Sequence, residues 1–180
     1  GVPHRWVNSV KKCVADIASN FTTNRMLIDY EERFYNKLAA RKALMLDKNY
    51  IMARQIAAWK RKVSAAWDNI VIRDVKRAEI ESEAMYVGKK YHFELTIDLA
   101  GLQKEDIGAE LVVATQIEAG QAANVVETRR LEIVASDDKS VTLALDYAPE
   151  HTGMFDVALR VFPVNDNLEH RMDFALVKWA

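Results

Sequence analysis

The chain has 180 residues, half of them apolar, so it can bury a hydrophobic core and is not a disordered chain. Its formal net charge of -1 gives no overall electrostatic reason to expect binding to a nucleic acid or a membrane surface, so we expect neither as a partner. The single cysteine, Cys13, excludes an internal disulfide and fits a reducing compartment, which predicts a cytoplasmic location.

Glycine and proline divide the chain into two parts. Neither residue occurs between Pro3 and Gly88, whereas the other five glycines and two prolines all lie from Gly88 onward. Residues 1–70 carry 13 Lys and Arg against 6 Asp and Glu, and the rest carries 12 against 20, so a positive part precedes a negative one. We expect an α+β chain: a helical segment over 1–70 and an all-β domain over 71–180.

The first part has the periodicity of amphipathic helices. Pro3 suits a first helical turn, and apolar residues then recur three and four positions apart at Trp6, Val10, Cys13, Val14 and Ile17. Residues 20–24 break this pattern and supply candidates for a helix N-cap. A second helix is marked by Met26, Leu27, Tyr30 and Phe34, and a third begins near Asp47 or Asn49.

The third helix carries a long apolar stripe. Its members are Met52, Ile56, Trp59, Val63, Ala66 or Trp67, and Ile70. Two shorter helices offer little surface to bury it against, so the helical part looks incomplete. We therefore expect exposed apolar surface and self-association through Trp59, Val63 and Trp67.

The second part alternates with a period of two, which predicts about seven strands in an immunoglobulin-like sandwich. The clearest run places Tyr91, Phe93, Leu95, Ile97 and Leu99 on one face. The other runs are 71–80, 107–113, 125–135, 141–147, 155–161 and 172–179. Turn residues occupy the connectors, as in 136–139 and 165–167.

Histidine and cysteine do not indicate a catalytic or metal site. The four histidines, His4, His92, His151 and His170, have no spacing that favours metal ligation, so we interpret them as solvated or structural. Cys13 falls on the apolar stripe of the first helix, where a buried structural thiol is expected rather than a nucleophile.

Other candidate residues also have ordinary structural interpretations. The carboxylates Glu31–Glu32, Asp137–Asp138 and Asp166 fall on a helix surface or in turns, so they do not form an obvious catalytic pair. Lys60–Arg61–Lys62 is interpreted as a solvated or docking surface, because no aromatic platform for a nucleic acid flanks it. Trp6, Trp59 and Trp67 could stack on sugars, but their helical spacing favours core or interface positions. We assign no catalytic, cofactor-binding or metal-binding residue.

Several segments resemble a known enzyme family. Residues 1–12, 21–27 and 30–35 resemble the last helices of bacterial α-glucan (glycogen or maltodextrin) phosphorylases. Residues 152–163 and 170–180 resemble the β-domain that closes the short bacterial form of that family. The first block is the more specific, and residues 71–127 resemble the family only in pattern.

The resemblance implies a role within a larger enzyme. In that family two Rossmann-like lobes hold pyridoxal phosphate as a Schiff base with a lysine. The cofactor's phosphate takes part in proton transfer as orthophosphate cleaves a terminal α-1,4 glucosidic bond with retention. This chain lacks the Ser-Gly-Thr stretch leading to the lysine and every strand-helix unit of a lobe, so no catalytic or cofactor residue can be assigned to it.

The resemblance thus favours a C-terminal fragment of a phosphorylase, a glycosyltransferase of carbohydrate metabolism. The missing initiator methionine also favours a processed chain or a piece of a longer one. Such a fragment is expected to be inactive alone and to have a structural or docking role. Its expected partner is the remainder of the catalytic body, and α-glucan is a further candidate ligand. The main alternative is a stand-alone protein-interaction or carbohydrate-binding module.

Overall fold

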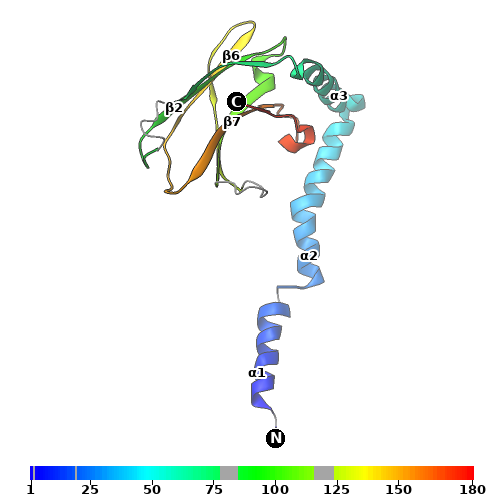
Figure 1. The fold of residues 1–180 in the computed structure, drawn as a ribbon. Coiled ribbons are helices and arrows are strands. Elements are labelled where there is room, and N and C mark those ends of the chain that lie inside the picture. The colour runs from blue at the N-terminus through cyan, green and yellow to red at the C-terminus, as the bar shows by residue number, and fades with distance from the viewer. Residues whose placement is uncertain (2, 19, 78–84, 116–123) are drawn as a thin grey trace. The chain divides into compact units, whose positions relative to one another are not determined.

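The computed structural model describes residues 1, 3–18, 20–77, 85–115 and 124–180. The chain divides into two compact units, residues 1–55 and residues 56–180. Unit 1 is helical, and unit 2 contains the end of the last helix and all the described strands (Figure 1). Among the described residues, no helix is both long and apolar enough to cross a membrane.

Unit 1 consists of helices joined by short irregular turns. Helix α1 (His4–Cys13) runs into a π-helical turn, η1 (Val14–Ala18), and α2 (Thr23–Tyr30) runs into a second one, η2 (Glu31–Tyr35). The predicted break over 20–24 is confirmed: the Thr22 hydroxyl caps α2 by accepting a hydrogen bond from the Arg25 N–H at 3.2 Å. Thr22 thereby satisfies one of the N–H groups that a helix start leaves without an intrahelical partner.

Helix α3 (Asn36–Trp67) is interrupted where the sequence predicts a helix start. Asp47 has an extended backbone, and Lys48, Asn49 and Tyr50 have positive φ angles of 46°, 58° and 63°. Three successive non-glycine residues in the left-handed region are unusual, because each places its Cβ against a neighbouring carbonyl. The Asp47 carboxylate accepts a hydrogen bond from the Lys48 N–H at 2.9 Å within this turn. The helix over 51–67 therefore starts anew after the turn.

Unit 2 contains two four-stranded antiparallel sheets. Sheet A has the strand order β1-β2-β6-β5, and sheet B has the order β4-β3-β7-β8. The strands are β1 (Val71–Arg77), β2 (Tyr91–Asp98), β3 (Ile107–Thr115), β4 (Val125–Arg130), β5 (Glu132–Ser136), β6 (Ser140–Tyr147), β7 (Phe155–Pro163) and β8 (Lys178–Trp179). Among its described residues, unit 2 also contains two 3-10 turns, η4 (Lys104–Asp106) and η5 (Arg171–Phe174). Helices followed by strands confirm the α+β class.

The two sheets share one hydrophobic core. Strand β2 buries alternate side chains, namely Tyr91, Phe93, Leu95 and Ile97, as its period of two predicts. Strand β3 is buried along nearly its whole length, because it lies between β4 and β7. Side chains from β2, β3, β6 and β7 meet in the same core cluster.

Two predicted strands are wrong in their extent. The run 125–135 is two strands, since the chain leaves sheet B after Arg130 and enters sheet A at Glu132. Leu131 at the crossing is 2% exposed, and no glycine or proline occurs over 125–135 to mark the change of sheet. The run 172–179 begins in the turn η5 and continues through irregular chain over 175–177, with only Lys178 and Trp179 in a strand. Eight strands thus occur among the described residues, and positions 78–80 of the first predicted run lie outside them.

The apolar stripe of the third helix does not lack a partner, which corrects the sequence interpretation. Within unit 2, Val63 is fully buried, Trp67 is 6% exposed and Ile70 is 2% exposed, all in the core cluster that the sheets share. The period of the stripe is right, but its partner is the β-domain and not the other helices. Val63 and Trp67 are therefore not the exposed surface that the sequence predicted, and self-association through the exposed helices stays a prediction.

Candidate functional site

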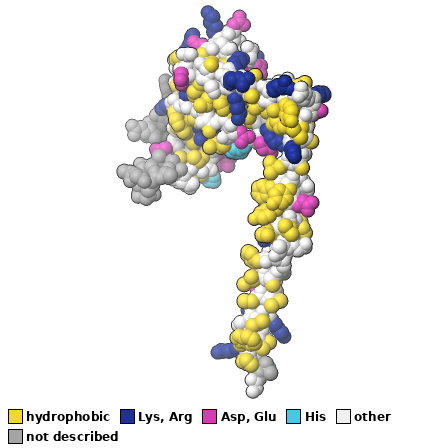
Figure 2. Space-filling view, turned by 90° about the vertical axis from the view of Figure 1, so that its right-hand side faces the viewer, with side chains coloured by type: hydrophobic (Ala, Val, Ile, Leu, Met, Phe, Trp, Pro, Cys, Tyr) yellow, Lys and Arg dark blue, Asp and Glu magenta, His cyan; other side chains and the backbone are white. Residues whose placement is uncertain are grey.

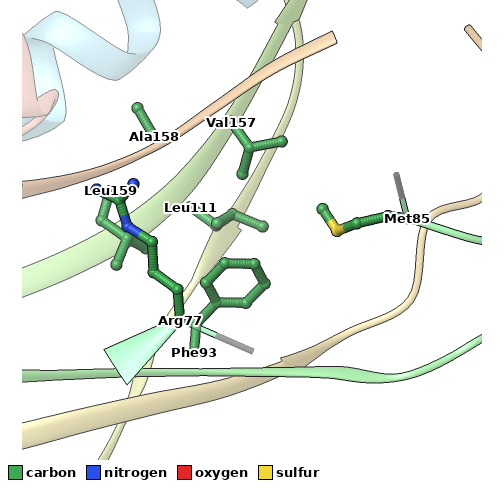
Figure 3. A pocket seen from close by; sticks show the side chains of 7 residues that line it. All are labelled: Arg77, Met85, Phe93, Leu111, Val157, Ala158 and Leu159. Atoms are coloured by element: carbon green, nitrogen blue, oxygen red, sulfur yellow. The ribbon is translucent and has the colours of Figure 1, made fainter. Parts of the chain in front are cut away.

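A small cavity lies between the two sheets of unit 2. It measures about 90 Å³ and is lined by Arg77, Met85, Phe93, Leu111, Val157, Ala158 and Leu159. Figure 3 shows Phe93, Leu111 and Val157 gathered at its centre, with Arg77 as the one charged side chain among the labelled residues. Ligand pockets usually measure at least about 300 Å³, so this cavity is too small for a sugar residue. The lining residues that the structure describes include no nucleophile and no carboxylate.

The histidines lie on separate elements. His4 belongs to α1 and is exposed, and His151 is exposed between β6 and β7. His170 caps η5, where its Nδ1 accepts a hydrogen bond from the Met172 N–H at 3.1 Å. His92 lies on the outer face of sheet A with its Nδ1 at 2.7 Å from Asp146, and its pKa is raised by that hydrogen bond and by Glu94. No group of three or more potential metal ligands occurs among the described residues.

Cys13 and the suspected carboxylates are also dispersed. Cys13 is exposed, so the expectation of a buried thiol is wrong for this chain. Glu31 and Glu32 lie on the exposed turn η2. The Asp137 carboxylate shapes the turn between β5 and β6 by accepting hydrogen bonds from the N–H groups of Lys139 and Ser140, at 2.8 and 2.6 Å. These bonds hold its pKa below the ordinary value, and they account for Asp137 as a turn residue.

The basic cluster Lys60–Arg61–Lys62 binds largely within its own unit. Lys60 donates to the Asp173 carbonyl at 2.6 Å, and Lys62 pairs with the Asp106 carboxylate at 3.2 Å. The indole N–H of Trp59 donates to the same carboxylate at 2.8 Å. Burial alone would raise the pKa of Asp106, but these bonds and one from the Gln103 N–H lower it. These contacts fasten the end of α3 to η4 and η5, so they account for two of the three cations.

A buried charge network on sheet B was missed by sequence reasoning. Glu110 on β3 is 7% exposed, and its carboxylate accepts hydrogen bonds from Arg160 on β7 and Arg171 on η5. Arg160 also lies over the ring of Trp179 on β8, 5.7 Å from its centroid. The two arginines lie 50 and 61 positions from Glu110 in the sequence. Only an apolar run interrupted by one acid at Glu110 could have suggested the network.

Unit 1 presents apolar side chains along its length, as Figure 2 shows. None of its described residues is buried. The predicted stripe of α1 and η1 is uncovered, with Trp6 66%, Val14 61% and Ile17 53% exposed. Single exposed apolar residues are ordinary, but a continuous stripe marks an interaction surface. Unit 1 therefore leaves a continuous apolar stripe uncovered among its described residues.

Comparison with known proteins identifies the family. Residues 67–180 match the family model described as "Glycogen phosphorylase C-terminal domain". The chain belongs to this family. The match begins at the last residue of α3 and includes every described strand, so the sheets of unit 2 are the glycogen phosphorylase C-terminal domain.

The relatives extend the similarity into the helices. Maltodextrin phosphorylase of Thermococcus litoralis is 28% identical over 179 residues, which are 97% of this chain and 20% of that protein. Glycogen phosphorylase of Mycobacterium tuberculosis is 26% identical over 162 residues, 90% of this chain and 16% of that protein. The chain thus spans about a fifth of the length of the curated relatives it matches. No solved structure matches it significantly.

Proposed function

We propose that the chain is the C-terminal part of an α-glucan phosphorylase and acts as a non-catalytic structural region of that enzyme. The observation that carries this proposal is the similarity to maltodextrin phosphorylase, which covers 97% of this chain and 20% of the relative. In the whole enzyme, phosphate would cleave an α-1,4-glucan to glucose 1-phosphate. Pyridoxal phosphate would be held by the remainder of the polypeptide, because no residue of this chain is assigned to bind it.

Each unit then has its own role. The uncovered stripe of unit 1 would dock on the catalytic body, since burying such a stripe is what stabilises an amphipathic helix. Unit 2 would fold as an appended domain with an immunoglobulin-like arrangement, for which its two antiparallel four-stranded sheets are the support. A reduced, exposed Cys13 fits a cytoplasmic enzyme.

Reconstitution from two pieces tests the docking role. The catalytic body, ending immediately before Gly1, is co-expressed with this chain. The two should co-purify, and phosphorolysis of maltodextrin with added pyridoxal phosphate should need both. Alone, this chain should give neither a Schiff-base absorbance band nor glucose 1-phosphate. Phosphorolysis by the isolated chain would refute its non-catalytic role.

A matched pair of variants tests the face that docks. Trp6→Asp places a carboxylate on the apolar stripe of α1, and Asn8→Asp adds the same charge on the opposite side of the same helix. The first variant should weaken co-purification at least about tenfold, because it leaves a charge in an apolar contact, and the second should not. Equal effects of the two would contradict docking through the stripe.

The alternative proposal is a carbohydrate-binding module. It is supported by exposed aromatic side chains of unit 2, of which Trp179 is 59% and Tyr86 60% exposed. Retention of the isolated chain on an α-glucan resin, lost in Trp179→Ala, would favour this alternative. Co-purification with the catalytic body and no retention on the resin would favour docking.

A further inference from the structure

A row of charged and aromatic side chains crosses the outward face of sheet B. Glu110 on β3 is paired with Arg130 on β4 and with Arg160 on β7, and Arg160 is paired with Trp179 on β8. Residues directly opposite one another in neighbouring strands lie on the same face. Arg171 reaches this face from η5 and bonds the Glu110 carboxylate. Three arginines therefore share this face with one carboxylate, which is bonded by Arg160 and Arg171.

Arg130 lies beside Gly108, which is two residues before Glu110 and on the same face. A Cβ on Gly108 would lie 3.4 Å from an Arg130 terminal nitrogen and 3.2 Å from the Phe162 ring, so the bare backbone leaves room for both. The Arg171 guanidinium lies 5.3 Å from the centroid of the same Phe162 ring. Arg130 and Arg171 thus both lie next to Phe162.

The charges at this position do not balance. Arg160 is 15% exposed and bonds Glu110, so it is sufficient to neutralise that carboxylate. Arg171 is 41% exposed, and Arg130 forms no ion pair with any described residue. On the adjoining turns, the Asp106 carboxylate pairs with Lys62, whereas the Asp173 carboxylate accepts a hydrogen bond from the His170 N–H and keeps its negative charge. On the sheet face itself, three arginines accompany the single carboxylate of Glu110, so positive charge is in excess there.

We propose that Arg130 and Arg171, backed by Arg160, form a binding site for a phosphate group on the outer face of sheet B. Planar guanidinium groups bind phosphate oxygens through paired N–H donors. A phosphate carries nearly two negative charges near neutral pH, which matches the excess better than a carboxylate does. The ligand is free orthophosphate or the phosphate group of a small sugar ester. This inference does not depend on the proposed function.

Titration of the full chain with inorganic phosphate tests the site, with calorimetry and amide NMR as readouts. Phosphate should bind at millimolar concentrations, weaken with added sodium chloride, and shift the Gly108 amide resonance. Arg130→Gln should weaken binding at least about tenfold, because it removes one charge-assisted donor pair. Arg129→Gln is the matched control, since it removes the same charge from the opposite face of β4 and should leave the affinity unchanged.

A second variant separates binding from stability. Glu110→Gln removes the central negative charge, so it should tighten phosphate binding severalfold, whereas a purely structural network predicts no binding in either protein. A sugar monophosphate titrated in parallel distinguishes the two sources: preference for the ester or for the free ion identifies the ligand, and both support the site. The proposal is overturned if neither ligand binds, or if Arg129→Gln and Arg130→Gln weaken binding equally.

Discussion

Phe93 and His92 are neighbours in the chain, but the first side chain is buried and the second is exposed. Phe93 is 3% exposed and lines the small cavity between the sheets, whereas the His92 side chain is 55% exposed on the outer face of sheet A. The difference comes only from the period of two in β2, because successive side chains point to opposite faces. For these two residues, the sequence pattern predicts the environment of the side chain correctly.

Substitutions at these two positions should differ sharply in cost. Phe93→Asp places a carboxylate without a partner among apolar side chains, so unfolding in urea should need at least about 3 kcal/mol less free energy. His92→Asn removes only an exposed hydrogen-bonded pair and should stay within about 1 kcal/mol. Equal losses in the urea midpoint would mean that the alternation of β2 is misassigned.

His92 should also make the stability of unit 2 depend on pH. The hydrogen bond to Asp146, with a smaller contribution from Glu94, raises its pKa above the ordinary value of 6.5. The protonated form is therefore favoured in the folded state. The stabilisation that protonated His92 adds to the folded state is fully present below pH 6.5, and it is lost as pH rises through the raised pKa of the folded state. Urea midpoints of the chain and of His92→Asn should converge between about pH 5.5 and about pH 9. A constant difference across that range would show that the His92 pair does not stabilise the fold.

At the scale of elements, periodicity predicted the helices and most strands but not their partners. The stripe of α3 was recognised from its spacing, while its burial against the sheets involves Lys60 bonding Asp173, 113 positions away. The same limit applies to Glu110, whose arginines come from distant strands and turns. The change of sheet at Leu131 was missed because no glycine or proline over 125–135 marks it. Local patterns carry no information about which elements meet.

Two apolar residues of α3 test where its stripe is buried. Trp67→Ala should lower the free energy of unfolding by about 3–5 kcal/mol, because it leaves a cavity in the core that the sheets share. Leu44→Ala, in the part of α3 that belongs to unit 1, should cost less than about 0.5 kcal/mol, since Leu44 is 56% exposed. Urea denaturation followed by far-UV circular dichroism measures the free energy of unfolding of both variants without relying on the fluorescence of Trp67. Similar losses in the two variants would argue against burial of the stripe in unit 2.

At the scale of the whole molecule, the N-terminal boundary of the β-domain can be drawn at two positions. The change from helix to strand lies between Trp67 and Val71, where the sequence predicts a domain boundary at residues 70 and 71. The compact units instead divide between Gln55 and Ile56, within α3. The two boundaries differ in whether the last turns of α3 belong to the folded β-domain. We infer that they do, because Val63 and Trp67 lie in its core and Trp59, Lys60 and Lys62 bond its turns.

Three fragments decide between these boundaries. Residues 56–180 should unfold cooperatively with the same urea midpoint as the β-domain in the full chain, because their core is complete. Residues 71–180 keep every described strand but lose the side chains of Val63 and Trp67 from the core, so their urea midpoint should be clearly lower. Residues 1–55 should be only marginally helical in water, since none of their described residues is buried. If 71–180 were as stable as 56–180, the boundary at residue 70 would hold and the helix would be an accessory to a domain that is complete without it.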